Sequence, residues 1–401
     1  MLSQTLPLRR TLLPGKRFFS SSIHHHVPLT SFSSVWLRDS CQCPLCIHPS
    51  TKQKLHQSSD VSPDIKPVEG SAESTPDGTY VTWSDGHESF FPSGFLERHS
   101  SPQNLRNFHR DVDWVEWDVP ILEKSANLFL PYDVVKTSTG LHQAITQLTR
   151  YGLLFVKDVP NEKKSDEECE LRTLGERFGE LRRTFYGEVW DVKAVKNSRN
   201  IAYTNVDLGL HMDLLYFQHP PRYQILHCLR NRVEGGTSIF VDAARVASDL
   251  RKSDPEVFKT LSTTPVGFHY INDGHHLHFS HPTIQLSRFP NPLTGEHDVE
   301  FINYSPPFQA PLAANTPPHF YSALRKFATM LAAPQVQYKY LLKEGDAVLF
   351  DNRRVLHART EFKEREVESS KEETNRWLKG CYIEADAVLD RGRVLDAQLK
   401  Q

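Results

Sequence analysis

The chain has 401 residues, of which 38 % are hydrophobic and 24 % are charged, and its formal net charge at pH 7 is −2. This composition is typical of a folded globular protein, and no apolar run is long enough to predict a membrane span. The small net charge argues against a chain that binds nucleic acid or anionic lipid through a broad basic surface. A small-molecule substrate is therefore the favoured partner, and the length predicts one large domain and a smaller one.

The amino-terminal segment differs in composition from the rest of the chain. Its first 38 residues contain no Asp or Glu but carry Arg9, Arg10, Lys16 and Arg17 among Leu, Ser and Thr. This composition is typical of a mitochondrial presequence, so we expect residues 1–26 to be one and the protein to reach the mitochondrial matrix. A disordered basic tail on a cytoplasmic protein is the alternative.

Three of the six cysteines, Cys41, Cys43 and Cys46, lie within one short segment, and the other three are scattered. Crowded thiols favour a metal site over disulfides in a reducing compartment. His87, in a turn after the strand-like residues 80–83, supplies a fourth ligand for tetrahedral zinc. Four protein ligands leave no open position, so we expect a structural role for this zinc. Two other histidines could take the place of His87: His48 and His56.

These ligands predict a small N-terminal zinc-binding β domain over residues 27–105. Within it, residues 57–78 are rich in Ser, Pro, Asp and Glu, which is typical of an exposed loop. We interpret residues 106–130 as a linker and residues 131–401 as the larger, catalytic domain.

The larger domain begins with a helical pattern. Ser138 can cap the start of this helix, and Gly152 lies where a helix would stop. Between them, apolar residues recur at helical spacing: Leu141, Ala144, Ile145 and Leu148. A second helix is expected over residues 318–331, with these side chains on one face: Phe320, Leu324, Phe327 and Leu331.

Short apolar segments separated by turn residues dominate the rest of this domain. Strands are expected at residues 153–156, 223–229, 238–241, 301–304, 338–342 and 347–350. Many short strands with long excursions between them predict an α+β, mainly β fold. The expected architecture is a jelly-roll or β-barrel core with helices packed outside it.

A histidine and a carboxylate that suit one metal ion lie two residues apart, at His211 and Asp213. On an extended strand, both side chains point to the same side. His357, at the end of a predicted strand, offers a third ligand. Two histidines and one carboxylate leave three positions open, as in non-haem iron oxygenases. The histidine-rich residues 274–281 form a competing proposal, but they lack a carboxylate partner and are expected to be a solvated loop.

Two further side chains suit a dicarboxylic cosubstrate. Arg376 follows His357 by nineteen residues, close enough to lie on the next strand and reach the same site. Its guanidinium could bind a carboxylate through two hydrogen bonds. Ser238 follows a Gly-Gly-Thr turn and is a second candidate contact, with an ordinary turn serine as the alternative.

Together, these residues resemble the γ-butyrobetaine and trimethyllysine dioxygenases of carnitine biosynthesis, which are TauD-like enzymes. The resemblance covers most of the chain. It implies a double-stranded β-helix core, iron(II), 2-oxoglutarate as cosubstrate and the same zinc site in the N-terminal domain. The motifs that carry it lie at residues 36–39, 203–204, 211–213, 226–228, 235–236, 350–352, 376 and 380–382.

The same resemblance implies a pocket for a trimethylammonium group. A quaternary ammonium cannot donate a hydrogen bond, so proteins surround it with aromatic faces, each worth about 0.5–2 kcal/mol. Four aromatic residues match the positions of this cage: Tyr186, Trp190, Tyr203 and Tyr382. Without the resemblance, core packing would be the favoured interpretation of these residues.

The sequence departs from both branches of this family. Residues 216–218 look like the trimethyllysine branch, whereas the intact cysteine cluster is closer to the butyrobetaine branch. Residues 301–306 lack the paired asparagines of both branches, so contacts to the other end of the substrate do not transfer.

We therefore expect an iron(II)/2-oxoglutarate-dependent dioxygenase that converts γ-butyrobetaine to L-carnitine, with ascorbate as reductant. A trimethyllysine hydroxylase or a paralogue with another substrate is the alternative within this chemistry. A catalytically inactive, zinc-bearing interaction protein is the alternative of another class. The sequence leaves a homodimer open.

Overall fold

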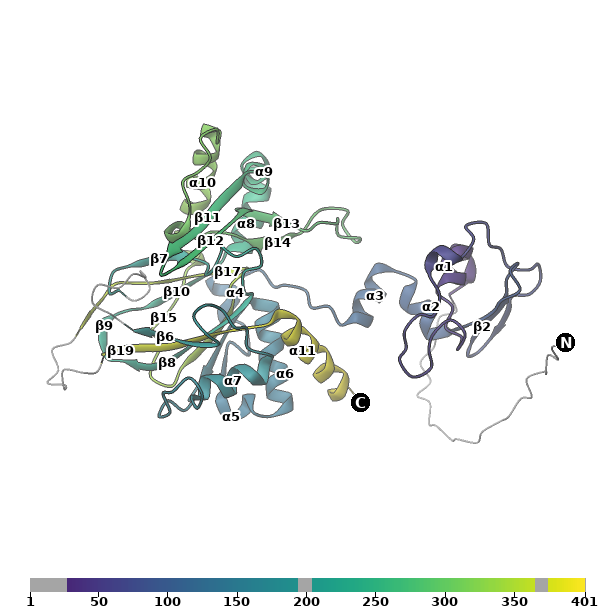
Figure 1. The fold of residues 1–401 in the computed structure, drawn as a ribbon, viewed down its shortest axis with the longest axis horizontal. Helices are drawn as coiled ribbons and strands as arrows, with labels where there is room; N and C mark the ends of the chain where they lie inside the picture. The colour runs from purple at the N-terminus through teal and green to yellow at the C-terminus, as the bar shows by residue number, and fades with distance from the viewer. Residues whose placement is uncertain (1–26, 194–203, 365–373, 401) are drawn as a thin grey trace. The chain divides into compact units, whose positions relative to one another are not determined.

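The computed structural model describes residues 27–193, 204–364 and 374–400, drawn as a ribbon in Figure 1. The chain divides between His109 and Arg110 into two compact units, which we call the N-terminal and C-terminal units. The presequence predicted for residues 1–26 lies outside the described residues. No helix in the described ranges is long and apolar enough to cross a membrane.

The N-terminal unit is built on an antiparallel sheet in the order β1-β2-β3. Its strands are β1 (Glu73–Thr75), β2 (Gly78–Thr82) and β3 (Glu88–Pro92), and its helices are η1 (Leu29–Ser31), α1 (Ser34–Asp39), η2 (Ser58–Asp60), α2 (Ser93–His99) and α3 (Pro102–His109). Leu37, Trp83 and Phe91 form the centre of its hydrophobic core. This arrangement confirms the predicted small β domain.

Two segments are more ordered than the sequence predicts. The polar residues 57–78 were expected to form an exposed loop, but Val61 and Ile65 are buried in the core of the N-terminal unit. Residues 106–130 were expected to be a linker, but Trp117 and Leu122 are fully buried in the C-terminal unit. Isolated apolar residues in a polar segment are enough to anchor it, because each buries its side chain even where no periodicity is visible.

Two sheets form the core of the C-terminal unit (Figure 1). Within the described residues, the larger has the order β4-β5-β16-β8-β19-β6 and the smaller β15-β10-β17-β7. The larger sheet contains β4 (Phe129–Pro131), β5 (Leu153–Lys157), β6 (Val189–Lys193), β8 (Tyr223–Asn231), β16 (Ala347–Asp351) and β19 (Arg376–Ile383). The smaller contains β7 (Leu208–His211), β10 (Ser238–Asp242), β15 (Tyr338–Tyr340) and β17 (Val355–Arg359).

From β7 on, the strands alternate between these sheets along the chain, except that β15 follows β10 within the smaller one: β7, β10 and β17 belong to the smaller sheet, and β8, β16 and β19 to the larger. This alternation is that of a double-stranded β-helix and confirms the predicted jelly-roll core. The remaining strands form three ribbons: β9 (Val233–Gly235) with β18 (Phe362–Glu364), β11 (Pro265–Asn272) with β12 (His275–Pro282), and β13 (Ile284–Leu286) with β14 (Val299–Ile302).

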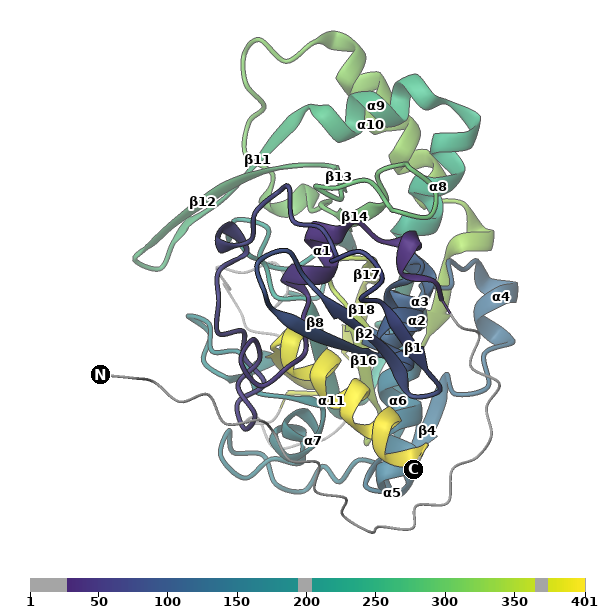
Figure 2. The same ribbon diagram turned by 90° about the vertical axis from the view of Figure 1, so that its right-hand side faces the viewer.

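Helices gather at opposite ends of the C-terminal unit (Figures 1 and 2). One group consists of α5 (Tyr132–Val135), α6 (Ser138–Tyr151), α7 (Glu170–Phe178) and α11 (Ala385–Leu399), and α6 and α7 pack on the larger sheet. The other group consists of α8 (Ala243–Ser253), α9 (Pro255–Thr263) and α10 (Pro318–Leu331), which pack together. Three short helices complete the unit: α4 (Val119–Glu123), η4 (Pro306–Phe308) and η5 (Pro334–Val336).

The two predicted helices are present, with one correction at a cap. Helix α6 ends at Tyr151 with Gly152 as its C-cap, and the φ of 71° there suits glycine. Its N-cap is Thr137, whose hydroxyl accepts a hydrogen bond from the Gly140 N–H. Ser138 is therefore the first helical residue. The histidine-rich segment was predicted to be a solvated loop, and this is wrong because residues 275–282 pair with β11 as strand β12.

Candidate active site

The predicted iron ligands converge at one place between the two sheets. His211 ends β7 and pairs directly with His357 on the neighbouring strand β17. Asp213 follows two residues after His211, and its Oδ1 lies 3.5 Å from His211 Nε2. One ligand atom from each of the three side chains lies within 4.8 Å of the others. Two imidazoles and a carboxylate at this spacing fit a ferrous ion with open positions.

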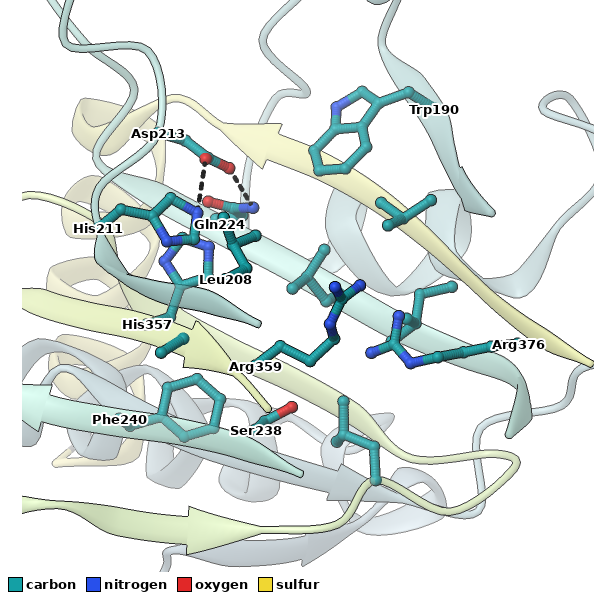
Figure 3. A pocket seen from close by; sticks show the side chains of 15 residues that line it. Trp190, Leu208, His211, Asp213, Gln224, Ser238, Phe240, His357, Arg359 and Arg376 are labelled. Carbon is teal, nitrogen blue, oxygen red and sulfur yellow. Dashed lines mark hydrogen bonds and ion pairs between the residues drawn. The ribbon is translucent and has the colours of Figure 1, made fainter. Parts of the chain in front are cut away.

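Hydrogen bonds around the triad fix which atoms face the metal position. His211 Nδ1 lies 2.8 Å from the Gly209 carbonyl oxygen, which leaves Nε2 to bind the metal. The Oδ2 of Asp213 accepts hydrogen bonds from Gln224 Nε2 at 2.9 Å and from the Tyr382 hydroxyl at 3.1 Å. Oδ1 is therefore the Asp213 oxygen directed at the histidines (Figure 3). Such outer contacts orient metal ligands.

Asn352 holds the backbone of Asp213. Its Oδ1 accepts from the Asp213 N–H at 2.8 Å, and its Nδ2 donates to the Asp213 and Pro221 carbonyl oxygens at 3.0 Å each. Asn352 is fully buried in the turn between β16 and β17. It thereby joins two ligand-bearing segments that lie far apart in the sequence.

The protonation states also suit a metal. Burial alone would raise the pKa of Asp213, but the hydrogen bond to His211 and the nearby His357 lower it instead. Burial, followed by the neighbouring His211, lowers the pKa of His357 to about 3. At neutral pH the site therefore offers a carboxylate and a neutral imidazole on β17, the forms that bind a divalent metal.

A pocket extends from the triad along both sheets (Figure 3). Arg376 begins β19 and Ser238 begins β10, and both are buried in its wall. No hydrogen bond or ion pair joins the Arg376 side chain to another described residue, and its buried Nε has no partner. Burial, and then the neighbouring Arg359, lower the pKa of Arg376 to about 10, so it remains a cation at neutral pH. This geometry fits the carboxylate of 2-oxoglutarate.

Arg359 is a second cation in this pocket that sequence reasoning missed. Its guanidinium faces that of Arg376 in Figure 3, and its only hydrogen bond to a described residue goes to the Val206 carbonyl oxygen. Both guanidiniums approach the Phe362 ring, at 4.9 and 5.4 Å from its centroid. The signal was available, because Arg359 follows His357 by two residues on a strand and so points to the same side.

Three of the four predicted cage residues lie together beside the triad. The Trp190 ring centroid lies 5.3 Å from that of Tyr382 and 6.2 Å from that of Tyr186. Trp190 lines the iron pocket. It lies across Gly380, where any Cβ would come within 2.1 Å of the indole ring. The fourth predicted residue, Tyr203, lies outside the described residues.

The N-terminal unit contains the predicted Cys3His cluster. The Nε2 of His87 lies 3.3 Å from the sulfur of Cys41 and 3.5 Å from those of Cys43 and Cys46. Burial, and then the charge of Cys41, raise the pKa of Cys46 to about 12. A bound zinc ion would instead lower the pKa of all three cysteines and hold them as thiolates.

The two alternative zinc ligands have other partners. His48 Nδ1 accepts a hydrogen bond from the Thr51 N–H, and His56 Nε2 lies 3.2 Å from Asp39. The cluster is therefore completed by His87, on the turn between β2 and β3.

Comparison with known proteins identifies the family. Residues 125–382 match "Taurine catabolism dioxygenase TauD, TfdA family", and residues 24–97 match "Gamma-butyrobetaine hydroxylase-like, N-terminal". Dioxygenase str8 of Strobilurus tenacellus is 52 % identical over 92 % of this chain and 87 % of that protein. The γ-butyrobetaine dioxygenase of Homo sapiens is 29 % identical over 91 % of each chain.

The mitochondrial trimethyllysine dioxygenase of Gallus gallus is 29 % identical over 92 % of this chain and 84 % of that one. Among solved structures, a taurine dioxygenase from Burkholderia xenovorans covers 66 % of this chain and 92 % of its own, with 18 % identity and a TM-score of 0.45. The chain belongs to the TauD/TfdA family of dioxygenases.

Proposed function

We propose that this dioxygenase uses iron(II) and 2-oxoglutarate to hydroxylate a small molecule that bears a trimethylammonium group, with γ-butyrobetaine as that substrate. One observation carries the proposal. A single pocket is lined by His211, Asp213 and His357 near its aromatic wall and, further along, by the cation Arg376, which no ion pair joins to another described residue. A dicarboxylic cosubstrate can reach from a metal ion at the triad to Arg376.

The chain's own residues would hold and orient the reactants. When bound, ferrous iron with 2-oxoglutarate and dioxygen supplies the oxidising chemistry. Arg376, with Arg359 and Ser238, would bind the distal carboxylate of the cosubstrate and so fix its distance from the triad. Apolar side chains of the same pocket exclude water and strengthen these ionic contacts: Leu226, Phe240, Leu342 and Leu378.

Aromatic side chains support the trimethylammonium part of the proposal. The rings of Trp190 and Tyr382 lie beside the metal position, tilted by 40° to each other, and Tyr382 donates to the iron ligand Asp213. A cation held against these rings would lie close to the metal, where a neighbouring carbon could react. Positioning of this kind accounts for a large part of enzymatic rate enhancement.

The contacts that bind the other end of the substrate do not transfer from the butyrobetaine and trimethyllysine enzymes. Asn303 is the one asparagine of residues 301–306, and it is buried and donates to the Pro282 carbonyl oxygen. The identity to str8 is 52 %, against 29 % to both the butyrobetaine and the trimethyllysine enzyme, which favours a paralogue with another substrate as the second candidate.

An inactive, zinc-bearing interaction protein is less well supported, since a protein without turnover would not need the triad, its orienting hydrogen bonds and two buried arginines that face one pocket. Ascorbate as reductant, a homodimer and the mitochondrial location stay predictions.

The test is a succinate-release assay on the purified chain with iron(II) and 2-oxoglutarate. We expect succinate in step with hydroxylated product on γ-butyrobetaine, and less on trimethyllysine or on the dimethylamine analogue of γ-butyrobetaine. Equal turnover of the trimethyl and dimethyl compounds would contradict the aromatic cage. No substrate-linked succinate on either trimethylated compound would contradict the proposed substrate class.

A further inference from the structure

A second cavity lies beside the turn between β16 and β17. Its volume is about 560 Å³, and it shares no lining residue with the iron pocket. Its walls include residues 218–220, Arg222, the end of β12, the start of α11 and Arg353 in the turn itself. Nothing in the proposed reaction uses this cavity.

Arg353 is the unusual residue of the cavity wall. Its side chain is only 4 % exposed, yet its Nε has no hydrogen-bond partner. No ion pair or side-chain hydrogen bond connects its guanidinium to another described residue, and its Cζ lies 4.4 Å from the centroid of the Phe301 ring. A largely buried guanidinium that no carboxylate among the described residues balances is costly, because its lost hydration is only partly compensated.

The nearby acidic groups are already engaged or stay at a distance. Asp351 accepts from Arg222 at 3.0 Å, and Glu384 lies 3.7 Å from Arg182. Burial lowers the pKa of Arg353 to about 10, although Asp351 and Glu300 act in the opposite direction from further away. Arg353 therefore stays charged at neutral pH and faces a cavity that two more guanidiniums line.

We propose that this cavity binds a small anion with a carboxylate or phosphate group, held by Arg353 and assisted by Arg182 and Arg222. A guanidinium fork suits both groups, since each presents two oxygens to parallel N–H donors. The rim also carries Glu384 and Asp386, which disfavour a highly charged anion and favour one small enough to reach Arg353. Binding here requires neither iron nor 2-oxoglutarate, so it stands apart from the proposed reaction.

The test is calorimetric titration of the full chain, without iron, with sodium phosphate and separately with sodium acetate, at constant ionic strength set by sodium chloride. We expect saturable binding of at least one of the two anions in this cavity, separate from any binding at Arg376 in the iron pocket, which Arg376→Met removes. Arg353→Met should weaken that binding at least about tenfold, because it removes charge-assisted hydrogen bonds. The matched control Arg325→Met changes an exposed arginine of α10 and should leave binding unchanged.

A second variant keeps the proposal testable if Arg353→Met fails to fold. Glu384→Gln removes a half-exposed negative charge from the rim and should tighten anion binding about two- to fivefold. Saturation by phosphate alone identifies a phosphate site, and saturation by acetate alone identifies a carboxylate site. Equal affinity in the wild type and Arg353→Met, weaker binding in Glu384→Gln, or no saturable binding of either anion would overturn the proposal.

Discussion

Replacing Arg376 with Met should stabilise the protein in the absence of 2-oxoglutarate and weaken 2-oxoglutarate binding at the same time. The buried guanidinium has no partner among the described residues, and its pKa falls from 12.5 to about 10 through burial and the neighbouring Arg359. At about 1.4 kcal/mol per tenfold change, the charge costs the folded protein up to about 3 kcal/mol at neutral pH. Methionine fills similar space without that cost.

The same substitution should destabilise the complex with 2-oxoglutarate. Two charge-assisted hydrogen bonds to a carboxylate contribute about 1.5–3 kcal/mol each, so their loss should raise the dissociation constant of 2-oxoglutarate at least about hundredfold. Urea denaturation measures the first effect, and anaerobic titration of the iron(II) protein with 2-oxoglutarate measures the second. Arg325→Met, on the exposed face of α10, is the control. An Arg376→Met protein that is less stable, or that binds 2-oxoglutarate as the wild type does, would refute this reasoning.

Three other predictions follow from separate parts of the structure. Cys41→Ser should lower the bound zinc content and expose the N-terminal unit to proteolysis, as measured by metal analysis and limited digestion; full zinc content would count against the cluster. Burial lowers the pKa of His227 to about 4 from 6.5. Because the unfolded chain then binds this proton at a higher pH than the folded protein does, the free energy of unfolding should fall by about 2 kcal/mol from pH 7 to pH 5. In His227→Leu, the fall in the free energy of unfolding from pH 7 to pH 5 should be smaller by that amount. An unchanged pH dependence in urea denaturation would contradict a neutral, buried His227. Trp190→Leu should raise the KM for trimethylammonium substrates about two- to thirtyfold, and Gly380→Ala should do the same by displacing the indole; unchanged discrimination against dimethyl analogues in both variants would exclude the cage.

The candidate iron ligands could be predicted from short sequence patterns. The two-residue spacing of His211 and Asp213 predicted side chains on one side, although β7 ends at His211 and Asp213 lies just after it. The same spacing would have pointed from His357 to Arg359. The orienting residues were not predictable in this way. Gln224 and Asn352 meet Asp213 only through the pairing of strands far apart in the sequence, and pairing register cannot be read from one chain.

The errors have physical causes as well. The histidine-rich strand β12 was mistaken for a loop because its imidazoles are polar, although Leu277, Phe279 and His281 alternate as a strand requires. The cap of α6 was misplaced by one residue because Thr137 and Ser138 are both good N-caps. Trp117 was assigned to a linker because a single buried aromatic residue has no periodic pattern around it.

X-ray diffraction from crystals grown anaerobically with iron(II) and 2-oxoglutarate, recorded at the iron and zinc absorption edges, tests the central claim most directly. The account predicts an iron peak among His211, Asp213 and His357, and a separate zinc peak among the three cysteines and His87. An iron peak elsewhere, or an empty triad in crystals that contain iron, would contradict it.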